Sequence, residues 1–172
     1  MKRGLVLEGG AMRGLFTAGI IDVMMEAGIE PDGLFGVSAG AAFGCNYKSR
    51  QPGRAIRYNA RFAKDSRYSG VWSLLKSGDY FNAKFGYHII PKVYDVFDDE
   101  AFEQNPMAFI VVCTDVETGK AVYQELTKAD YETYEWIRAS ASMPLASKAT
   151  FSILGSPFAS RVTRSVSFPL SS

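Results

Sequence analysis

The sequence is poor in the residues and patterns that mark several protein classes. Its two cysteines, Cys45 and Cys113, are too few for a disulfide-rich scaffold and suit reduced thiols. No apolar run approaches the roughly 20 residues of a membrane span, and Glu8 cuts the N-terminal run Leu5-Val6-Leu7 short of a signal peptide. The net charge of +1 provides no global attraction to nucleic acid. We therefore expect a cytoplasmic protein that does not bind nucleic acid.

The remaining composition is that of a folded domain with an unusual end. The 172 residues have single-domain length, and 47% of them are hydrophobic, so the chain can bury a core. No acidic residue follows Glu135 in the last 37 positions, where serine is frequent. We expect residues 1–148 to form the N-terminal part of one domain. We expect residues 149–172 to be an atypical Ser-rich tail, which a truncation or a change of reading frame would explain.

Strands alternate with helices along residues 1–142. Short apolar runs predict strands at 4–8, 34–37 and 109–114, and Thr118-Gly119 predicts a turn into 121–125. Helices are expected at 15–27, with Asp22 and Glu26 on the solvent side, from residue 39, at 52–64 and at 130–142, whereas 69–106 predicts short helices and loops. This alternation predicts an α/β layer fold with a mainly parallel sheet.

The segment at 52–64 and its flanks carry most of the basic excess. The spacing predicts that these side chains share one helix face; the residues are Arg50, Arg54, Arg57, Arg61 and Lys64. Such a face could contact an anionic membrane surface peripherally. The alternative is a solvated helix face with no ligand.

The segment Gly36-Val37-Ser38-Ala39-Gly40 fits the pattern G-x-S-x-G between a predicted strand and a predicted helix. A nucleophile elbow needs this context, because a sharp strand-to-helix turn exposes the Ser38 hydroxyl and the glycines avoid clashes. The amides that begin the helix at Ala39 would point toward a developing oxyanion. Ser38 is therefore the candidate nucleophile. The alternative is a Gly-flanked turn in which Ser38 caps the following helix.

A second glycine-rich segment lies between the first strand and the first helix. The spacing of Gly9, Gly10 and Gly14 does not match a dinucleotide-binding loop, and Leu15-Phe16 stands where a phosphate-binding P-loop needs Lys and Ser or Thr. Exposed amides at a helix start instead favour an oxyanion hole beside a serine nucleophile. The loop consists of Gly9, Gly10, Ala11, Met12, Arg13 and Gly14.

Together these motifs resemble the patatin-like phospholipase family, in which a Gly-rich loop after the first strand precedes a G-x-S-x-G elbow. The resemblance covers residues 4–148 and includes the segments Leu5–Gly10, Gly36–Gly40, Thr114–Gly119 and Ala139–Leu145. It implies a three-layer α/β/α fold and a serine-dependent lipid acyl hydrolase acting on a lipid or ester substrate, without a metal or organic cofactor. Ala11 stands where the family commonly has a third glycine. The resemblance still allows the amides of Gly10 and Ala11 to form the oxyanion hole, if the local φ permits.

The general base is not found in the sequence. The resembled family uses a Ser-Asp dyad whose Asp lies in an Asp-Gly-Gly or Asp-Gly-Ala motif downstream. Here Asp32-Gly33 precedes Ser38, fits a turn, and no Asp follows Asp130. A Ser-His-acid triad would need His88 with Asp65, Asp79 or another acid, but its setting favours a structural or surface histidine.

Two functions follow from these observations. The first is ester hydrolysis through an acyl-Ser38 intermediate, with the base unknown. The second is a catalytically impaired or non-catalytic patatin-fold protein that binds acyl groups or a partner.

Overall fold

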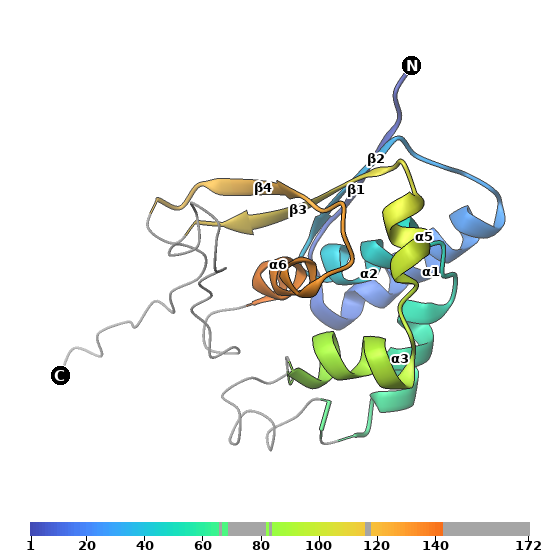
Figure 1. Cartoon of the computed structure of the whole chain (residues 1–172), viewed down its shortest axis with the longest axis vertical. Coiled ribbons are helices and arrows are strands. Elements are labelled where there is room, and N and C mark those ends of the chain that lie inside the picture. Colours follow the sequence, from blue (N-terminus) through green and yellow to red (C-terminus); the bar gives the residue numbers. More distant parts are fainter. Residues whose placement is uncertain (66, 69–81, 83, 116–117, 143–172) are drawn as a thin grey trace.

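A four-stranded sheet forms the centre of the computed structural model, which describes residues 1–65, 67–68, 82, 84–115 and 118–142. Its strands lie side by side in chain order: β1 (Gly4–Leu7), β2 (Gly33–Val37), β3 (Ala108–Thr114) and β4 (Ala121–Glu125). The first three are parallel, and β4 runs antiparallel to β3. The α/β fold with a mainly parallel sheet is therefore confirmed (Figure 1).

Helices occupy the connections between these strands. A 3₁₀ turn η1 (Ala11–Arg13) and helix α1 (Gly14–Glu26) link β1 to β2, and α2 (Ala39–Lys48) and α3 (Arg54–Phe62) follow β2. The π-helical segment η2 (Lys84–Tyr94) and α5 (Asp99–Gln104) precede β3, and α6 (Tyr131–Ala141) follows β4. Residues 69–81, for which short helices and loops are expected, lie outside the described residues. Among the described helices, none combines the length and apolarity needed to cross a membrane.

The described helices cover one face of the sheet (Figure 1). β1, β2 and β3 succeed one another in a single direction, and right-handed crossovers then place the connecting helices on the same side. Phe109 and Val111 are fully buried toward these helices. On the opposite face Val6 and Tyr123 are 73% and 63% exposed. The helix-covered face is therefore where the core lies.

Helix α1 turns a different face to solvent from the one expected. Asp22 is buried beside α3, where its charge acts on Arg57. Glu26 is exposed, as expected, but three apolar side chains of α1 are exposed too. Phe16, Ile20 and Val23 lie at positions i, i+4 and i+7 and therefore share one face. The expectation that Asp22 lies on the solvent side is wrong, because periodicity does not reveal that α3 packs there.

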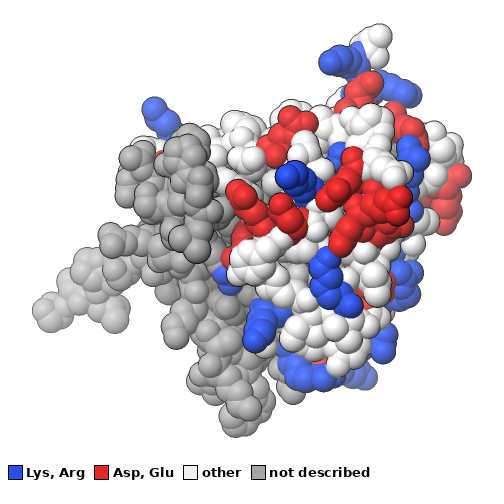
Figure 2. All heavy atoms as spheres, in the orientation of Figure 1, with Lys and Arg blue, Asp and Glu red and all other residues white. Residues whose placement is uncertain are grey.

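The expected basic helix face is wrong in its extent, because α3 carries Arg54, Arg57 and Arg61 but not the other two residues. Helix α3 begins at Arg54 and ends at Phe62, so Arg50 and Lys64 lie outside it. Arg54 is only 4% exposed, since its guanidinium donates to the carbonyl oxygen of Asp95 at 2.6 Å. Arg57 makes a bidentate ion pair with the carboxylate of Asp95, and both N···O distances are 2.8 Å. Figure 2 shows basic side chains around α3 and acidic ones gathered over α5.

Candidate active site

The chain turns sharply at Ser38, between the end of β2 and the start of α2. Ser38 has φ 54° and ψ −118°, a positive φ that residues other than glycine rarely adopt. Holding it there costs about 1–3 kcal/mol. The strand, strained turn and helix are the context that a nucleophile elbow requires. The capping alternative requires a hydrogen bond from the Ser38 side chain to the first turn of α2, and the Ser38 side chain makes no such bond.

Close backbone contacts explain the two glycines that flank Ser38. A Cβ added to Gly40 would lie 2.2 Å from the carbonyl oxygen of Leu7, at the end of β1. A Cβ added to Gly36 would lie 2.7 Å from the Cα of Ala41. Both distances are far below contact distance, so β1 and α2 approach the elbow as closely as they do only because these positions lack side chains.

The glycine-rich loop lies directly beside the elbow. A Cβ added to Gly9 would lie 3.1 Å from the Cβ of Ser38 and 3.7 Å from its Oγ. At the other end of the loop, a Cβ added to Gly14 would lie 2.8 Å from the Cβ of Ala39. The fold therefore brings together the two segments that the sequence singles out.

Within this loop the backbone changes direction at Gly10 and Ala11. Gly10 has φ 176°, and Ala11 has φ 47°, in the left-handed region. Ala11 then opens the 3₁₀ turn, in which the Arg13 N–H donates to the Gly10 carbonyl at 3.0 Å. Met12 is 42% exposed in this turn. The amides of Gly10 and Ala11 are thus carried on a turn held by its own hydrogen bond, directly after Gly9, the loop residue that lies against Ser38.

A hydroxyl that sequence reasoning did not single out contacts the elbow. The Ser38 N–H donates to Ser140 Oγ at 2.8 Å, and Ser140 Oγ donates to the carbonyl oxygen of Val112 on β3 at 2.7 Å. Ser140 lies near the end of α6, which Asp130 caps by accepting the Thr133 N–H at 3.0 Å. The resemblance of segment 139–145 to a family motif is the signal that could have drawn attention to it.

Neither His88 nor an acid hydrogen-bonds the Ser38 hydroxyl within the described part of the chain. His88 Nε2 lies 2.8 Å from Glu135 Oε1, an ion pair when the ring is protonated. Asp65, an expected triad acid, pairs with a neighbouring arginine, and Asp79 lies outside the described residues. The geometry therefore gives His88 a structural partner and leaves the general base unassigned.

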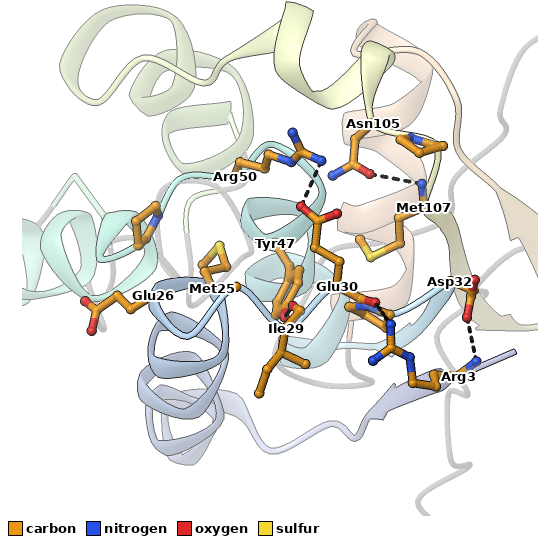
Figure 3. Close-up of a pocket in the computed structure, with 14 residues that line it drawn as sticks. Arg3, Met25, Glu26, Ile29, Glu30, Asp32, Tyr47, Arg50, Asn105 and Met107 are labelled. Carbon is orange, nitrogen blue, oxygen red and sulfur yellow. Dashed lines mark hydrogen bonds and ion pairs between the residues drawn. The ribbon is translucent and has the colours of Figure 1, made fainter. Parts of the chain in front are cut away.

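A pocket of about 540 Å³ lies at the amino ends of the parallel strands, opposite the end that carries Ser38 (Figure 3). Arg3 and Asp32, which precede β1 and β2, line it and are joined by a 2.6 Å hydrogen bond from the Arg3 N–H. An ion pair between Arg50 and Glu30, at 2.9 Å, crosses its rim. Since Ser38 follows the carboxyl end of β2, this pocket lies away from the elbow and is no part of the candidate active site.

The comparison with protein families agrees with this geometry. A family model of patatin-like phospholipases matches residues 5–157, which include both the loop and the elbow. The chain belongs to the patatin-like phospholipase family. In this patatin-like chain Ala11 has a left-handed φ of 47°, a conformation that glycine adopts without strain and alanine adopts at a cost of about 1 kcal/mol.

Curated relatives of this patatin-like chain include lysophospholipases. It is 28% identical over 145 residues to "Lysophospholipase nte1" of Aspergillus niger and 29% identical over 145 residues to "Lysophospholipase NTE1" of Chaetomium globosum. Both alignments cover 83% of this chain and 9% of the fungal protein. It is also 39% identical over 80 residues to "Uncharacterized protein YjjU" of Escherichia coli, covering 44% of this chain and 21% of that protein. The chain thus spans a small fraction of the length of these relatives.

Proposed function

We propose that this chain is a serine-dependent lipid acyl hydrolase that cleaves carboxylic esters through an acyl-Ser38 intermediate. The observation that carries the proposal is the conformation of Ser38, a strained residue at φ 54° between β2 and α2 with the glycine-rich loop against its side chain. A solvent-facing turn does not need this strain, and strained residues persist where a site depends on them. Family membership supports the lipid class of substrate.

The proposed reaction begins at the hydroxyl of Ser38. Its oxygen attacks the carbonyl carbon of the ester and its proton passes to a base, while the carbonyl oxygen becomes negatively charged. The amides of Gly10 and Ala11, and the positive end of α2, are the groups proposed to stabilise that charge. The alcohol part of the ester then leaves with the proton held by the base. Water attacks the acyl-enzyme and gives its hydroxyl to the acyl group and its proton, through the base, to Ser38, which frees the fatty acid and restores the serine.

The contact with a lipid aggregate is proposed at α1 rather than at α3. Arg54 and Arg57 are engaged with Asp95, which reduces the charge that α3 offers to an anionic surface. The apolar face of α1, defined above by Phe16, Ile20 and Val23, begins two residues after the loop that adjoins Ser38. A lipid surface that covered this face would present its esters beside the elbow.

Labelling with a fluorophosphonate, which reacts with activated serine hydroxyls, tests the proposal. The 172-residue chain should form a covalent adduct on the peptide that contains Ser38, and Ser38→Ala should abolish it. Substituting Phe16→Ser should weaken sedimentation with phosphatidylcholine vesicles and leave labelling by the soluble probe unchanged. Equal sedimentation of the variant and the wild-type chain would remove the α1 contact from the proposal.

A second candidate function rests on a specific feature of the sequence. No Asp follows Asp130, so these 172 residues lack the downstream Asp-Gly of the family's dyad. The corresponding hypothesis is a chain that has the elbow but is catalytically impaired, and that binds acyl groups or a partner. Loss of a triad member leaves a residual rate of about 10³–10⁴ over water in a well-studied protease. Failure of Ser38 to label, with tryptophan fluorescence showing a folded chain that binds a fatty acid, would favour this second function.

A further inference from the structure

The hydroxyl of Ser140 connects the elbow to the sheet. It accepts the Ser38 N–H at 2.8 Å and donates its one proton to the Val112 carbonyl at 2.7 Å. A serine hydroxyl has one donor and two acceptor positions. Donation to Val112 therefore directs the free lone pairs of the oxygen toward Ser38, and the two bonds define a single orientation of the Ser140 side chain.

Hydrogen bonds hold both backbone polar groups of the strained residue Ser38. The carbonyl oxygen of Ser38 accepts the N–H groups of Ala41 and Ala42, both at 3.0 Å, which ties it to the first turn of α2. Its N–H is beyond the end of β2, and Ser140 is the acceptor that holds it. A conformation at positive φ persists when its surroundings determine it from more than one direction.

The same contact also separates the roles of the backbone amides. Since the Ser38 N–H is engaged with Ser140, it is not a donor to a developing oxyanion. The donors that remain for that charge are the amides of the glycine-rich loop and those at the start of α2. The residue after the nucleophile is a usual oxyanion donor in such elbows. Ser140 thus contacts no reacting atom and acts through Ser38.

We propose that Ser140 is a positioning residue that holds the Ser38 elbow in its reactive conformation. Its effect on reactivity rests on the proposed function, whereas its effect on the Ser38 amide does not. Ser142 provides a matched control two residues away, because its hydroxyl donates to the Arg138 carbonyl of its own helix at 2.9 Å and makes no bond to the elbow.

Amide hydrogen exchange, measured by NMR on the full chain, tests the contact without any need for activity. The Ser38 amide of the wild-type chain should be protected. Ser140→Ala should accelerate its exchange about tenfold, the effect of losing one hydrogen bond, whereas Ser142→Ala should leave the rate unchanged. An unprotected Ser38 amide in the wild-type chain, or equal exchange in wild type and Ser140→Ala, overturns the proposal. The wild-type measurement decides even if Ser140→Ala does not fold.

Fluorophosphonate kinetics test the consequence for reactivity. Ser140→Ala should lower the rate constant of bond formation to Ser38 by about 100-fold and leave the half-saturating probe concentration unchanged, since small displacements of a reacting group have effects of this size. Ser140→Thr, which keeps the hydroxyl, should restore labelling, and Ser142→Ala should label as wild type. Equal labelling of Ser140→Ala and wild type overturns the positioning role. If the wild-type chain does not label at all, the proposed function fails, and the exchange experiment still decides the contact.

Discussion

Glycine at position 38 should make the chain more stable than alanine does. Neither Ser38→Gly nor Ser38→Ala carries the hydroxyl, so its loss cancels when the two are compared. The remaining difference is the Cβ at φ 54° and ψ −118°. Relief of the strain gains about 1–3 kcal/mol, and the greater freedom of glycine in the unfolded chain costs about 0.5–1 kcal/mol. The glycine variant is expected to be more stable by about 1 kcal/mol.

Thermal unfolding of the two variants in the same buffer measures this difference. For a chain of this size, about 1 kcal/mol corresponds to a Tm about 2–4 °C higher for Ser38→Gly. The control is Ala60→Gly at an exposed position inside α3, where the change should lower stability by about 1 kcal/mol. The reasoning is refuted if Ser38→Gly is less stable than Ser38→Ala, since position 38 then behaves like an ordinary helical one.

Three further predictions follow from burial and close contact. Burial raises the pKa of the Cys45 thiol to about 11 and that of the Cys113 thiol to about 12. Iodoacetamide at pH 8 should therefore label neither thiol in the native chain and both thiols in urea. Labelling of either thiol in the native chain would contradict its burial. Arg54→Ala should cost about 2–4 kcal/mol in urea unfolding, because the carbonyl oxygen of Asp95 and the amide oxygen of Asn46 lose their buried donor. Arg57→Ala should cost under about 1 kcal/mol, because the Arg57 side chain is half-exposed; equal costs for the two variants would refute this ranking. Gly40→Ala should lower the free energy of unfolding by about 3 kcal/mol or more and abolish fluorophosphonate labelling of Ser38, because the added methyl group clashes with the backbone of Leu7. A variant as stable as the wild-type chain would contradict the close approach of β1 to α2.

Local patterns in the sequence predicted the elements well. The apolar run at 109–114 corresponds to β3, and the small-residue start after Ser38 corresponds to α2. The elbow's flanking glycines were predictable too, because the clash they avoid lies within a few residues or at the end of the neighbouring strand. Such features depend on short-range sterics, which the order of residues reports directly.

Features that depend on distant partners could not be predicted in this way. Ser140 is 102 positions from Ser38 in the chain, and no spacing rule connects them. The burial of Arg54 and of Asp22 likewise depends on which elements pack against α3 and α1. Helical periodicity indicates which residues share a face, but the neighbour that covers the face is decided by tertiary packing. The sequence pattern around a buried charged residue is therefore the same as that around a solvent-exposed one.

The reactivity of Ser38 is the property on which the proposed hydrolase function depends most directly. The 172-residue chain should be incubated with a fluorophosphonate, digested, and its peptides analysed by mass spectrometry, with Ser38→Ala as the control. The prediction is one adduct, located on Ser38 and absent from the variant. A folded wild-type chain that acquires no adduct at Ser38, under conditions that label a known serine esterase to completion, would contradict the assignment of Ser38 as the nucleophile of a lipid acyl hydrolase.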